Sequence, residues 1–551
     1  MRDPRDVRMF RVLDKDIAEF AQKIYGSGKY EKTAFVPTEA NRGIVQAEMD
    51  ALVRRVNGLD TTDPVYDILA GHFMDYIEAT QAHINNCFAN PGGIFYGLGW
   101  RLRSICDRDT RPDVLRAEVL TATMEGATEL WQDGVLPSLA GLDAGKLSRA
   151  LAGLKHTASA AGYIKPKLGD FFKSLPTAQI EEISVALDGF IKDMDAHIAH
   201  TGNVMEEKGG APKGLARADD ETIPITREEY RETLKSNIGV NLDELLSWYE
   251  EENEKTRAES LALANKLKGP VKSTAEVSDI LFKYAGPCDS PEEMFRRVDV
   301  YLKRARAAAH QYVWLPEDEI CECVPIPEQL KDSYPWGGYS GDYPSKYPLY
   351  NTMFLNNFNY TAITDGWIKI NALHEAYPGH HVQFLRTAID PIPETMKRGA
   401  KHIPISEGTC IRTEREFEFV FAEDPFYPLM VAHRRHHTST RIKVDLWLHY
   451  FGKTIGEACD LYEKEMGFDR KTARAQVQAH ENGTGYFTGY YYGMKKICDW
   501  ERQYGWDSRE YTELLFSVGR VSMETFEKIL KLSPQDRHSL LHDFASLIQF
   551  A

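Results

Sequence analysis

Helix start signals recur along the chain, and they restrict its fold more than any other feature of the sequence. Capping-box patterns, in which Ser, Thr or Asn is followed three residues later by Glu, begin at Thr226, Asn241 and Ser273. Ser290 and Ser533 are each followed by proline, which favours the first position of a helix. Apolar residues between these signals recur every three or four residues. The pattern predicts an all-α, mainly helical protein.

Strand-like sequence is confined to one region. Residues 312–315 and 320–324 are short and β-prone, and the aromatic, proline-punctuated stretch 334–360 is predicted to be extended. We therefore expect a small β element that lines a cleft near the active site.

The stretch 202–224 contains several glycines and prolines and few large apolar residues. Such a composition predicts a flexible connection or a lid. We place a boundary there, with an N-terminal helical lobe at 1–224 and a catalytic helical lobe at 225–551, around a cleft.

Composition excludes several classes of protein. The net charge of −16 argues against a nucleic-acid partner, which would require clustered Lys and Arg. The sequence contains neither an apolar signal segment at its start nor an apolar run of about 18 residues, so no membrane partner is expected. The eight scattered cysteines include no CxxC pair and predict reduced thiols in a cytoplasmic protein. The oligomeric state stays open.

The sequence HEAYPGHH at residues 374–381 is the strongest chemical signal. Zinc peptidases often carry HExxH on a helix, with both histidines on the metal and the glutamate activating water. Here the position four residues after His374 is Pro378, which cannot bind a metal. Because proline lacks an N–H, the helix is expected to break at Pro378 and Gly379, which would bring His380 to that position. The rival ligand is His381, seven residues on and about 10 Å along an unbroken helix; we favour His380.

A third ligand is predicted about thirty residues downstream. Glu407 precedes a glycine that allows close approach of backbones, and Glu414 lies seven residues later on the same helical face. A buried carboxylate is unfavourable unless it is paired or on a metal. We therefore predict zinc bound by His374, His380 and Glu407, with Glu375 as general base.

These residues resemble a known family. The pattern HExxPGHxxQ, followed by Glu407 with Gly408 and by Glu414, is similar to a large bacterial family catalogued as a domain of unknown function and grouped with the gluzincin metallopeptidases. The similarity is expected from about Tyr230 to the C-terminus and is weaker before it. The resemblance implies a zinc peptidase.

Two further segments support the resemblance. Arg441, Asp445 and His449 resemble a helix of the family whose four-residue steps place all three side chains on one face. Residues 485–491 are similar both to this family and to the helical peptidases of the thimet-oligopeptidase type. That likeness implies that Tyr490, and with less support Tyr486, stabilises the oxyanion.

The sequence also departs from the family. Thr409, Arg412 and Thr484 stand where the family usually has Trp, Tyr and Pro. These changes concern substrate preference more than metal binding.

The roles of the Arg441 helix stay open at this point. Asp445 and His449 would either support a ligand or the substrate, or form a satisfied buried pair. Arg441 would either bind a peptide carboxylate or neutralise Asp445; we list Arg441, His449 and Tyr486 as substrate-binding candidates.

The prediction for function is a zinc-dependent hydrolase, a metallopeptidase that cleaves short peptides. The chemical alternative is hydrolysis of non-peptide amides or esters. An alternative of another class is a helical scaffold or binding protein without a catalytic metal.

Overall fold

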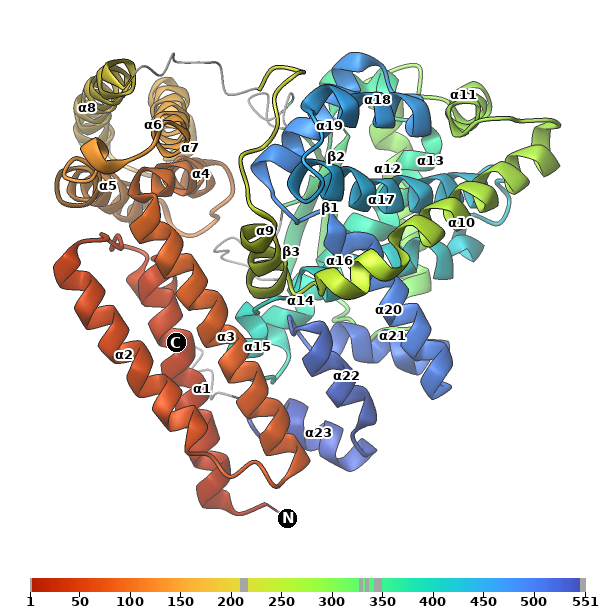
Figure 1. Cartoon of the computed structure of the whole chain (residues 1–551), viewed down its shortest axis with the longest axis horizontal. Coiled ribbons are helices and arrows are strands. Elements are labelled where there is room, and N and C mark those ends of the chain that lie inside the picture. The colour runs from red at the N-terminus through yellow and green to blue at the C-terminus, as the bar shows by residue number, and fades with distance from the viewer. Residues whose placement is uncertain (1, 209–216, 327–330, 332–335, 341–348, 546–551) are drawn as a thin grey trace.

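The protein is described by a computed structural model that covers residues 2–208, 217–326, 331, 336–340 and 349–545. Helices dominate these described residues, which also contain one small sheet (Figure 1). The predicted fold class, mainly helical with a small β element, is confirmed. Among the helices in this described part, none is both long and apolar enough to cross a bilayer.

Eight α-helices precede residue 209 in the described chain, and they divide between two hydrophobic cores. Their bounds are α1 (Pro4–Tyr25), α2 (Glu39–Asn57), α3 (Pro64–Ala89), α4 (Ile94–Asp107), α5 (Asp113–Glu129), α6 (Ala144–Ile164), α7 (Leu168–Phe171) and α8 (Thr177–Glu207). Helices α4–α8 enclose a core of their own. Helices α1–α3 instead share a core with the C-terminal helices.

The remaining helices follow residue 225. They are α9 (Arg227–Thr233), α10 (Leu242–Lys268), α11 (Thr274–Tyr284), α12 (Pro291–Ala309), α13 (Asp365–Asn371), α14 (His380–Ile389), α15 (Glu394–Arg398), α16 (Ile403–Glu416), α17 (Tyr427–His449), α18 (Ile455–Met466), α19 (Arg470–Asn482), α20 (Thr488–Tyr504), α21 (Ser508–Ser517), α22 (Met523–Lys531) and α23 (Pro534–His542).

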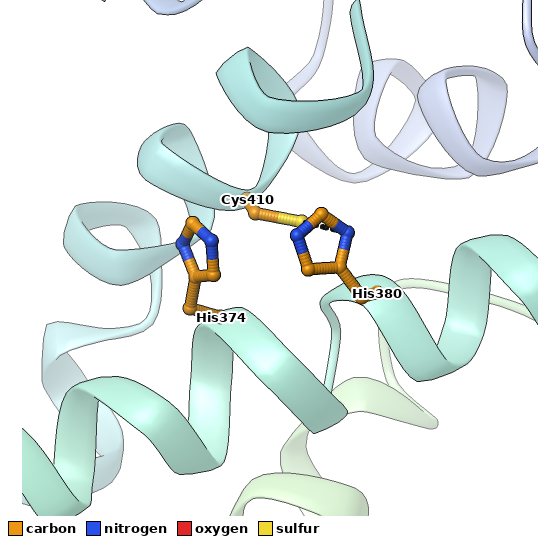
Figure 2. Close-up of side chains that lie close together, drawn as sticks. All are labelled: His374, His380 and Cys410. Carbon is orange, nitrogen blue, oxygen red and sulfur yellow. Dashed lines mark hydrogen bonds between the residues drawn. The ribbon is translucent and has the colours of Figure 1, made fainter. Parts of the chain in front are cut away.

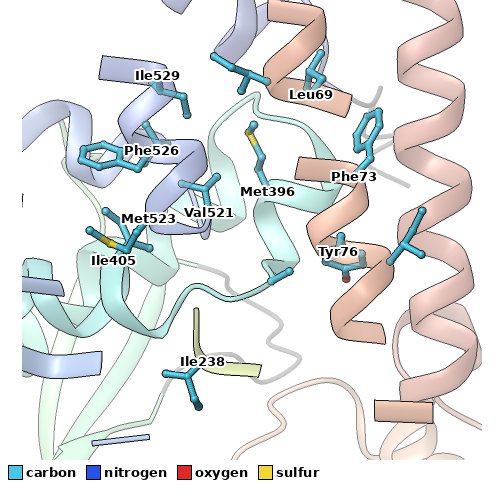
Figure 3. Close-up of a cluster of buried hydrophobic side chains, with 14 of the residues drawn as sticks. Leu69, Phe73, Tyr76, Ile238, Met396, Ile405, Val521, Met523, Phe526 and Ile529 are labelled. Carbon is cyan, nitrogen blue, oxygen red and sulfur yellow. The ribbon is translucent and has the colours of Figure 1, made fainter. Parts of the chain in front are cut away.

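The core shared by the two ends of the chain is built from side chains far apart in the sequence. Figure 3 shows Leu69 and Phe73 of α3 near Met396 of α15 and Phe526 of α22. Each of these side chains is fully buried. At about 25 cal/mol per Å² of apolar surface, such burial fixes α1–α3 firmly against the C-terminal helices.

The sheet has three strands, β1 (Ile320–Pro325), β2 (Gly337–Tyr339) and β3 (Tyr350–Leu355), in the order β1-β3-β2. Strand β3 pairs parallel to β1, with Ile320 opposite Tyr350, and antiparallel to β2, with Gly337 opposite Leu355. Met353 and Leu355 of β3 pack into the same core as α12 and α13.

Two local predictions for this region need correction. Residues 312–315 form a turn, a bend and irregular chain after α12 rather than a strand, because the N–H of Val313 bonds the carbonyl of Ala309 instead of a neighbouring strand. Only parts of 334–360 are extended: residues 357–360 belong to a 3₁₀ helix, Asn357–Ala362. Residues 334–335 and 341–348 lie outside the described residues.

The predicted helix starts are confirmed at all five positions. Thr226 forms a full capping box, in which its side chain and that of Glu229 exchange bonds with each other's backbone N–H groups. Asn241 and Ser273 cap α10 and α11, and Ser290 and Ser533 cap α12 and α23. Each cap oxygen accepts a backbone N–H that would otherwise lack a partner.

The predicted connection at 202–224 begins later than expected. Helix α8 continues through Gly202 to Glu207. Met205 near its end is buried, so the apolar face of the helix extends into the segment that was predicted to be a loop. Its glycine-rich part, residues 209–214, lies outside the described residues.

Candidate metal centre

The helix that carries His374 breaks where the sequence predicted. Helix α13 continues into a single π-helical turn, η9 (Ala372–Ala376), which contains His374 and Glu375. The Tyr377–Pro378 peptide bond is cis, and a new helix, α14, begins at His380. The break therefore separates the two histidines into two helices.

Gly379 makes this break possible. A Cβ atom at this position would lie 2.0 Å from the carbonyl oxygen of His374 and 2.2 Å from that of Leu373. Both neighbours are backbone atoms, so neither can rotate away. Only glycine allows the chain to turn this closely.

We expect Gly379→Ala to lower the free energy of unfolding by roughly 3 kcal/mol or more, because the added methyl group overlaps two backbone oxygens. Urea unfolding followed by circular dichroism measures the change. Gly162→Ala is the control, since Gly162 is an exposed residue of α6 and nothing lies within 4 Å of its added Cβ. That variant should be neutral or more stable by up to about 1 kcal/mol. Equal effects of the two substitutions would contradict the role of Gly379.

His380, and not His381, lies beside His374. The ring centroids of His374 and His380 are 5.0 Å apart, and both side chains point into one space (Figure 2). His381 turns away, and its Nε2 lies 2.6 Å from Oε2 of Glu319. Nδ1 of His381 lies 3.3 Å from the hydroxyl of Tyr339.

Glu407 of α16 completes a triangle with these two imidazoles. Its Oε2 atom lies 3.5 Å from Nε2 of His374 and 3.3 Å from Nε2 of His380. All three side chains are nearly buried, yet this oxygen makes no hydrogen bond. An unsatisfied buried carboxylate oxygen between two imidazole nitrogens is the arrangement a cation would satisfy.

The charges of this triangle depend strongly on one another. Burial opposes the protonated form of His374, but the facing carboxylates of Glu407 and Glu414 raise its pKa to about 10. Burial likewise opposes ionisation of Glu407, while the facing His380 and His374 hold the pKa of that carboxyl well below its usual range. The site therefore favours a carboxylate that faces positive charge.

Glu414 positions His374 from behind. Its Oε1 lies 2.8 Å from Nδ1 of His374, and its side chain is fully buried. A carboxylate on the second nitrogen of a histidine fixes the ring orientation and leaves the first nitrogen for a metal. The seven-residue spacing of Glu407 and Glu414 thus places one carboxylate inside the triangle and one behind it.

Cys410 is a neighbour that the sequence analysis did not single out. It lies three residues after Glu407 on α16, and its sulfur is 3.5 Å from Nδ1 of His380 (Figure 2). One potential ligand atom from each of His374, His380 and Cys410 falls within 4.8 Å of the others. The same nitrogen of His380 also lies 2.9 Å from Oε1 of Gln383, whereas Nε2 faces Glu407. The sequence does contain a sign of this contact, because Cys410 follows Glu407 by three residues and the two side chains therefore share one face of α16.

The predicted tyrosines reach the triangle through Glu407. The hydroxyl of Tyr486 donates to Oε1 of Glu407 at 2.6 Å, and the hydroxyl of Tyr490 donates to that of Tyr486 at 3.3 Å. Tyr486 therefore bonds to Glu407 directly and Tyr490 only through Tyr486, while the ring of Tyr490 stacks at 6.4 Å on that of His374. Burial raises the pKa of both phenols well above the usual value, so both remain hydrogen-bond donors at neutral pH.

Two glycines bring these tyrosines close. Helices α16 and α20 cross where a Cβ on Gly408 would lie 2.5 Å from the backbone of Gly493. A Cβ on Gly493 would in turn overlap the carbonyl oxygen of Pro404. The close crossing places residues 486–490 beside Glu407.

The remaining predicted residues lie in a neighbouring buried network. Asp445 accepts from the hydroxyl of Tyr230 at 2.7 Å and from the backbone N–H of Gly485 at 3.2 Å, and it lies 2.7 Å from Nδ1 of His480. His449 packs against this carboxylate at 3.2 Å. The network holds the loop that precedes Tyr486.

Arg441 lies next to this network but makes different contacts. Its guanidinium lies over the rings of Phe487 and Tyr490, at 4.7 and 5.4 Å, and donates to Gln476. In the described structure, Asp445 makes its ion pairs with His449 and His480 rather than with Arg441.

Glu375 occupies the turn beside the triangle. It follows His374 on the π-helical turn, where Ala372, Leu373, His374 and Ala376 are buried and Glu375 alone is partly exposed. Glu375 is therefore the least buried residue of this turn and directly follows the first imidazole in the chain.

Sequence comparison identifies the family. Residues 37–530 match the family described as "Bacterial protein of unknown function (DUF885)". The chain belongs to this family. The match begins well before Tyr230, in the part of the chain where weaker similarity was expected. Among curated proteins, none is detectably similar to this chain.

Two solved structures share the fold of this family member. One is described as a "putative lipoprotein" from Colwellia psychrerythraea, with a TM-score of 0.74 and 15% identity over 97% of this chain and 99% of that one. The other is described as a "putative lipoprotein of unknown function" from Shewanella oneidensis, with a TM-score of 0.71 and 16% identity over 95% of this chain and 99% of that one. At such low identity these likenesses establish the fold alone.

Proposed function

We propose that the protein is a zinc-dependent hydrolase of the gluzincin type that cleaves short peptides. The observation that carries the proposal is the unsatisfied, buried Oε2 of Glu407 between the Nε2 atoms of His374 and His380. Donors that share a tetrahedral zinc at about 2.1 Å are separated by roughly 3.4 Å. The separations of 3.5 and 3.3 Å in the structure fit that requirement.

The residues around the triangle have suitable roles in hydrolysis. Bound zinc supplies a Lewis acid that lowers the pKa of water and polarises a carbonyl group. Glu375 accepts the proton of the attacking water and returns it to the leaving amine. The hydroxyl of Tyr490, which donates to Tyr486 in the structure, would turn to donate its one hydrogen bond to the developing oxyanion, while Tyr486 continues to donate to Glu407. Glu414 holds His374 in position throughout.

We expect one zinc ion per chain in protein purified from zinc-replete cells, measured by elemental analysis. Removal of the metal by a chelator should abolish peptide hydrolysis and lower the unfolding temperature, because a ligand bound only to the folded state stabilises it. Readdition of zinc should restore both. Protein without zinc would favour the scaffold alternative.

The choice between peptides and other substrates is tested separately. A peptide, an ester and an arylamide that share one acyl group are compared by kcat/KM with the zinc-loaded protein. We expect the protein to hydrolyse the peptide, and a chelator to abolish this hydrolysis. Hydrolysis of the ester or arylamide alone would support the chemical alternative.

A further inference from the structure

A small cavity lies directly beside the metal centre. It has a volume of about 140 Å³, and two of the three predicted metal ligands, His380 and Glu407, form part of its wall. An apolar cavity of about 150 Å³ is large enough to bind a molecule of benzene. The space beside the metal ligands is therefore about as large as one phenyl ring.

The apolar part of this wall comes from three helices. Phe384 belongs to α14, Ile403 and Ile405 belong to α16, and Leu515 and Phe516 belong to α21. Ile405, Leu515 and Phe516 are each at most 3% exposed, so core packing holds them in place. The cavity therefore offers a preformed apolar surface on the side away from the metal ligands.

Three polar residues of the wall already have hydrogen-bond partners. The amide of Gln383 donates to the carbonyl of Ser406 at 2.8 Å, and the hydroxyl of Ser406 lies 3.0 Å from Nδ1 of His402. Tyr486 donates its only hydroxyl hydrogen to Glu407 at 2.6 Å. A polar side chain that entered the cavity would lose its hydrogen bonds to water with little in exchange. The wall therefore favours an apolar group.

A much larger cavity of about 1150 Å³ adjoins the small one. It lies between α1, α3 and α4 on one side and α14 and α15 on the other. Phe384, Thr387 and Arg520 line both cavities, and the guanidinium of Arg520 lies over the ring of Phe384 at 4.3 Å. Ligand cavities commonly measure about 300–1,000 Å³. The large cavity therefore has room for the rest of a short peptide, whereas the small one has room for a single side chain.

We propose that the small cavity is the specificity pocket of the proposed hydrolase and binds one apolar side chain of the size of leucine or phenylalanine, next to the bond that is cleaved. The inference rests on the proposed function for the chemistry, but the preference itself can be measured as binding. Because His380 and Glu407 belong to the wall, a side chain in the pocket holds the neighbouring peptide backbone beside the metal triangle. Burial of apolar surface supplies the affinity.

The experiment measures binding without cleavage, by calorimetry on the zinc-loaded Glu375→Gln variant. The probes are acetylated and amidated pentapeptides, Ala-Ala-X-Ala-Ala, in which X is Ala, Leu, Phe, Trp or Asp. We expect the Leu and Phe peptides to bind roughly tenfold or more tightly than the Ala peptide, since even one methylene in an apolar pocket changes affinity by about that factor. The Trp peptide should gain nothing, because an indole is larger than a phenyl ring. The Asp peptide should bind more weakly than the Leu peptide.

A larger pocket should accept a larger side chain. Leu515→Ala removes part of the wall, so the Trp peptide should bind this variant roughly tenfold more tightly than it binds the parent protein. If Leu515→Ala does not fold, Leu515→Val removes one methylene and should shift the preference in the same direction by a smaller factor.

Leu514→Ala is the matched control. Leu514 is the preceding residue of α21, is 6% exposed and packs in the same core as Leu515, but it is not among the described residues that line the pocket. The control removes the same atoms from the same core. It should leave the order of the five peptides unchanged.

Several results would overturn the inference. They are equal binding of the Ala, Leu and Phe peptides, binding of no peptide, a Trp or Asp peptide that binds the parent protein as tightly as the Leu peptide, and equal effects of Leu515→Ala and Leu514→Ala. The proposed function fails separately. Zinc-loaded wild-type protein that shows the preference in binding but hydrolyses none of the peptides would retain the pocket and lose the hydrolase. Hydrolysis of all five peptides with equal affinity and equal kcat/KM would retain the hydrolase and lose the pocket.

Discussion

Replacing Glu375 by Gln is expected to reduce kcat/KM for peptide hydrolysis by about 10³-fold while one zinc ion per chain is retained. The amide has the same shape as the carboxyl but cannot accept a proton, and positioned general bases contribute roughly 10²- to 10⁴-fold. Initial rates with a fluorogenic peptide, together with elemental analysis of the same preparation, measure the two quantities.

A control separates this effect from a general one. Glu206→Gln makes the same chemical change at an exposed position near the end of α8 and should leave both quantities unchanged. Loss of zinc in Glu375→Gln would mean that this residue holds the metal rather than the proton. Full activity in the variant would remove Glu375 from the mechanism.

The second large effect is expected at Glu407. Glu407→Gln should weaken zinc binding at least 100-fold, because it removes the only carboxylate that lies between the two imidazoles in the described structure. Competition with a chromogenic chelator measures the affinity, and activity should fall in parallel at limiting zinc.

Glu414→Gln is the matched comparison on the same helix. Its carboxylate contacts Nδ1 of His374 from outside the triangle, so the expected loss of affinity is smaller, roughly 10- to 100-fold. The test is whether Glu407→Gln weakens zinc binding more than Glu414→Gln does. A larger loss in Glu414→Gln than in Glu407→Gln would mean that the metal lies on the other side of His374.

Much of the local structure follows from short-range patterns. The caps at Thr226 and Ser290 and the helix break at Pro378 were predicted from residues within a few positions of each other. Such features depend on one hydrogen bond gained or lost, and a short stretch of sequence contains that information. The failed strand at 312–315 shows the limit, because β-prone residues need a partner strand that the sequence does not reveal.

The neighbours of the site residues could be predicted only in part. The sequence analysis favoured Glu407 as the ligand, but it assigned no role to Glu414, which lies behind His374 in the structure. The likeness to other peptidases favoured Tyr490, whereas Tyr486 contacts Glu407 directly. The loop geometry at Gly485 decides this order, and Asp445, forty residues away, holds that loop.

The sequence by itself determined the helical fold, the break between His374 and His380 and the helical face shared by Glu407 and Glu414, because each depends on interactions between residues close in the chain. Tertiary structure decided that His381 faces Glu319, that Tyr486 bonds to Glu407, and that α3 and α4 form a wall of the cavity beside α14. These arrangements depend on how buried surfaces fit, and at Gly408 and Gly493 on backbones that touch. Packing between segments hundreds of residues apart has no counterpart in any local pattern of the sequence.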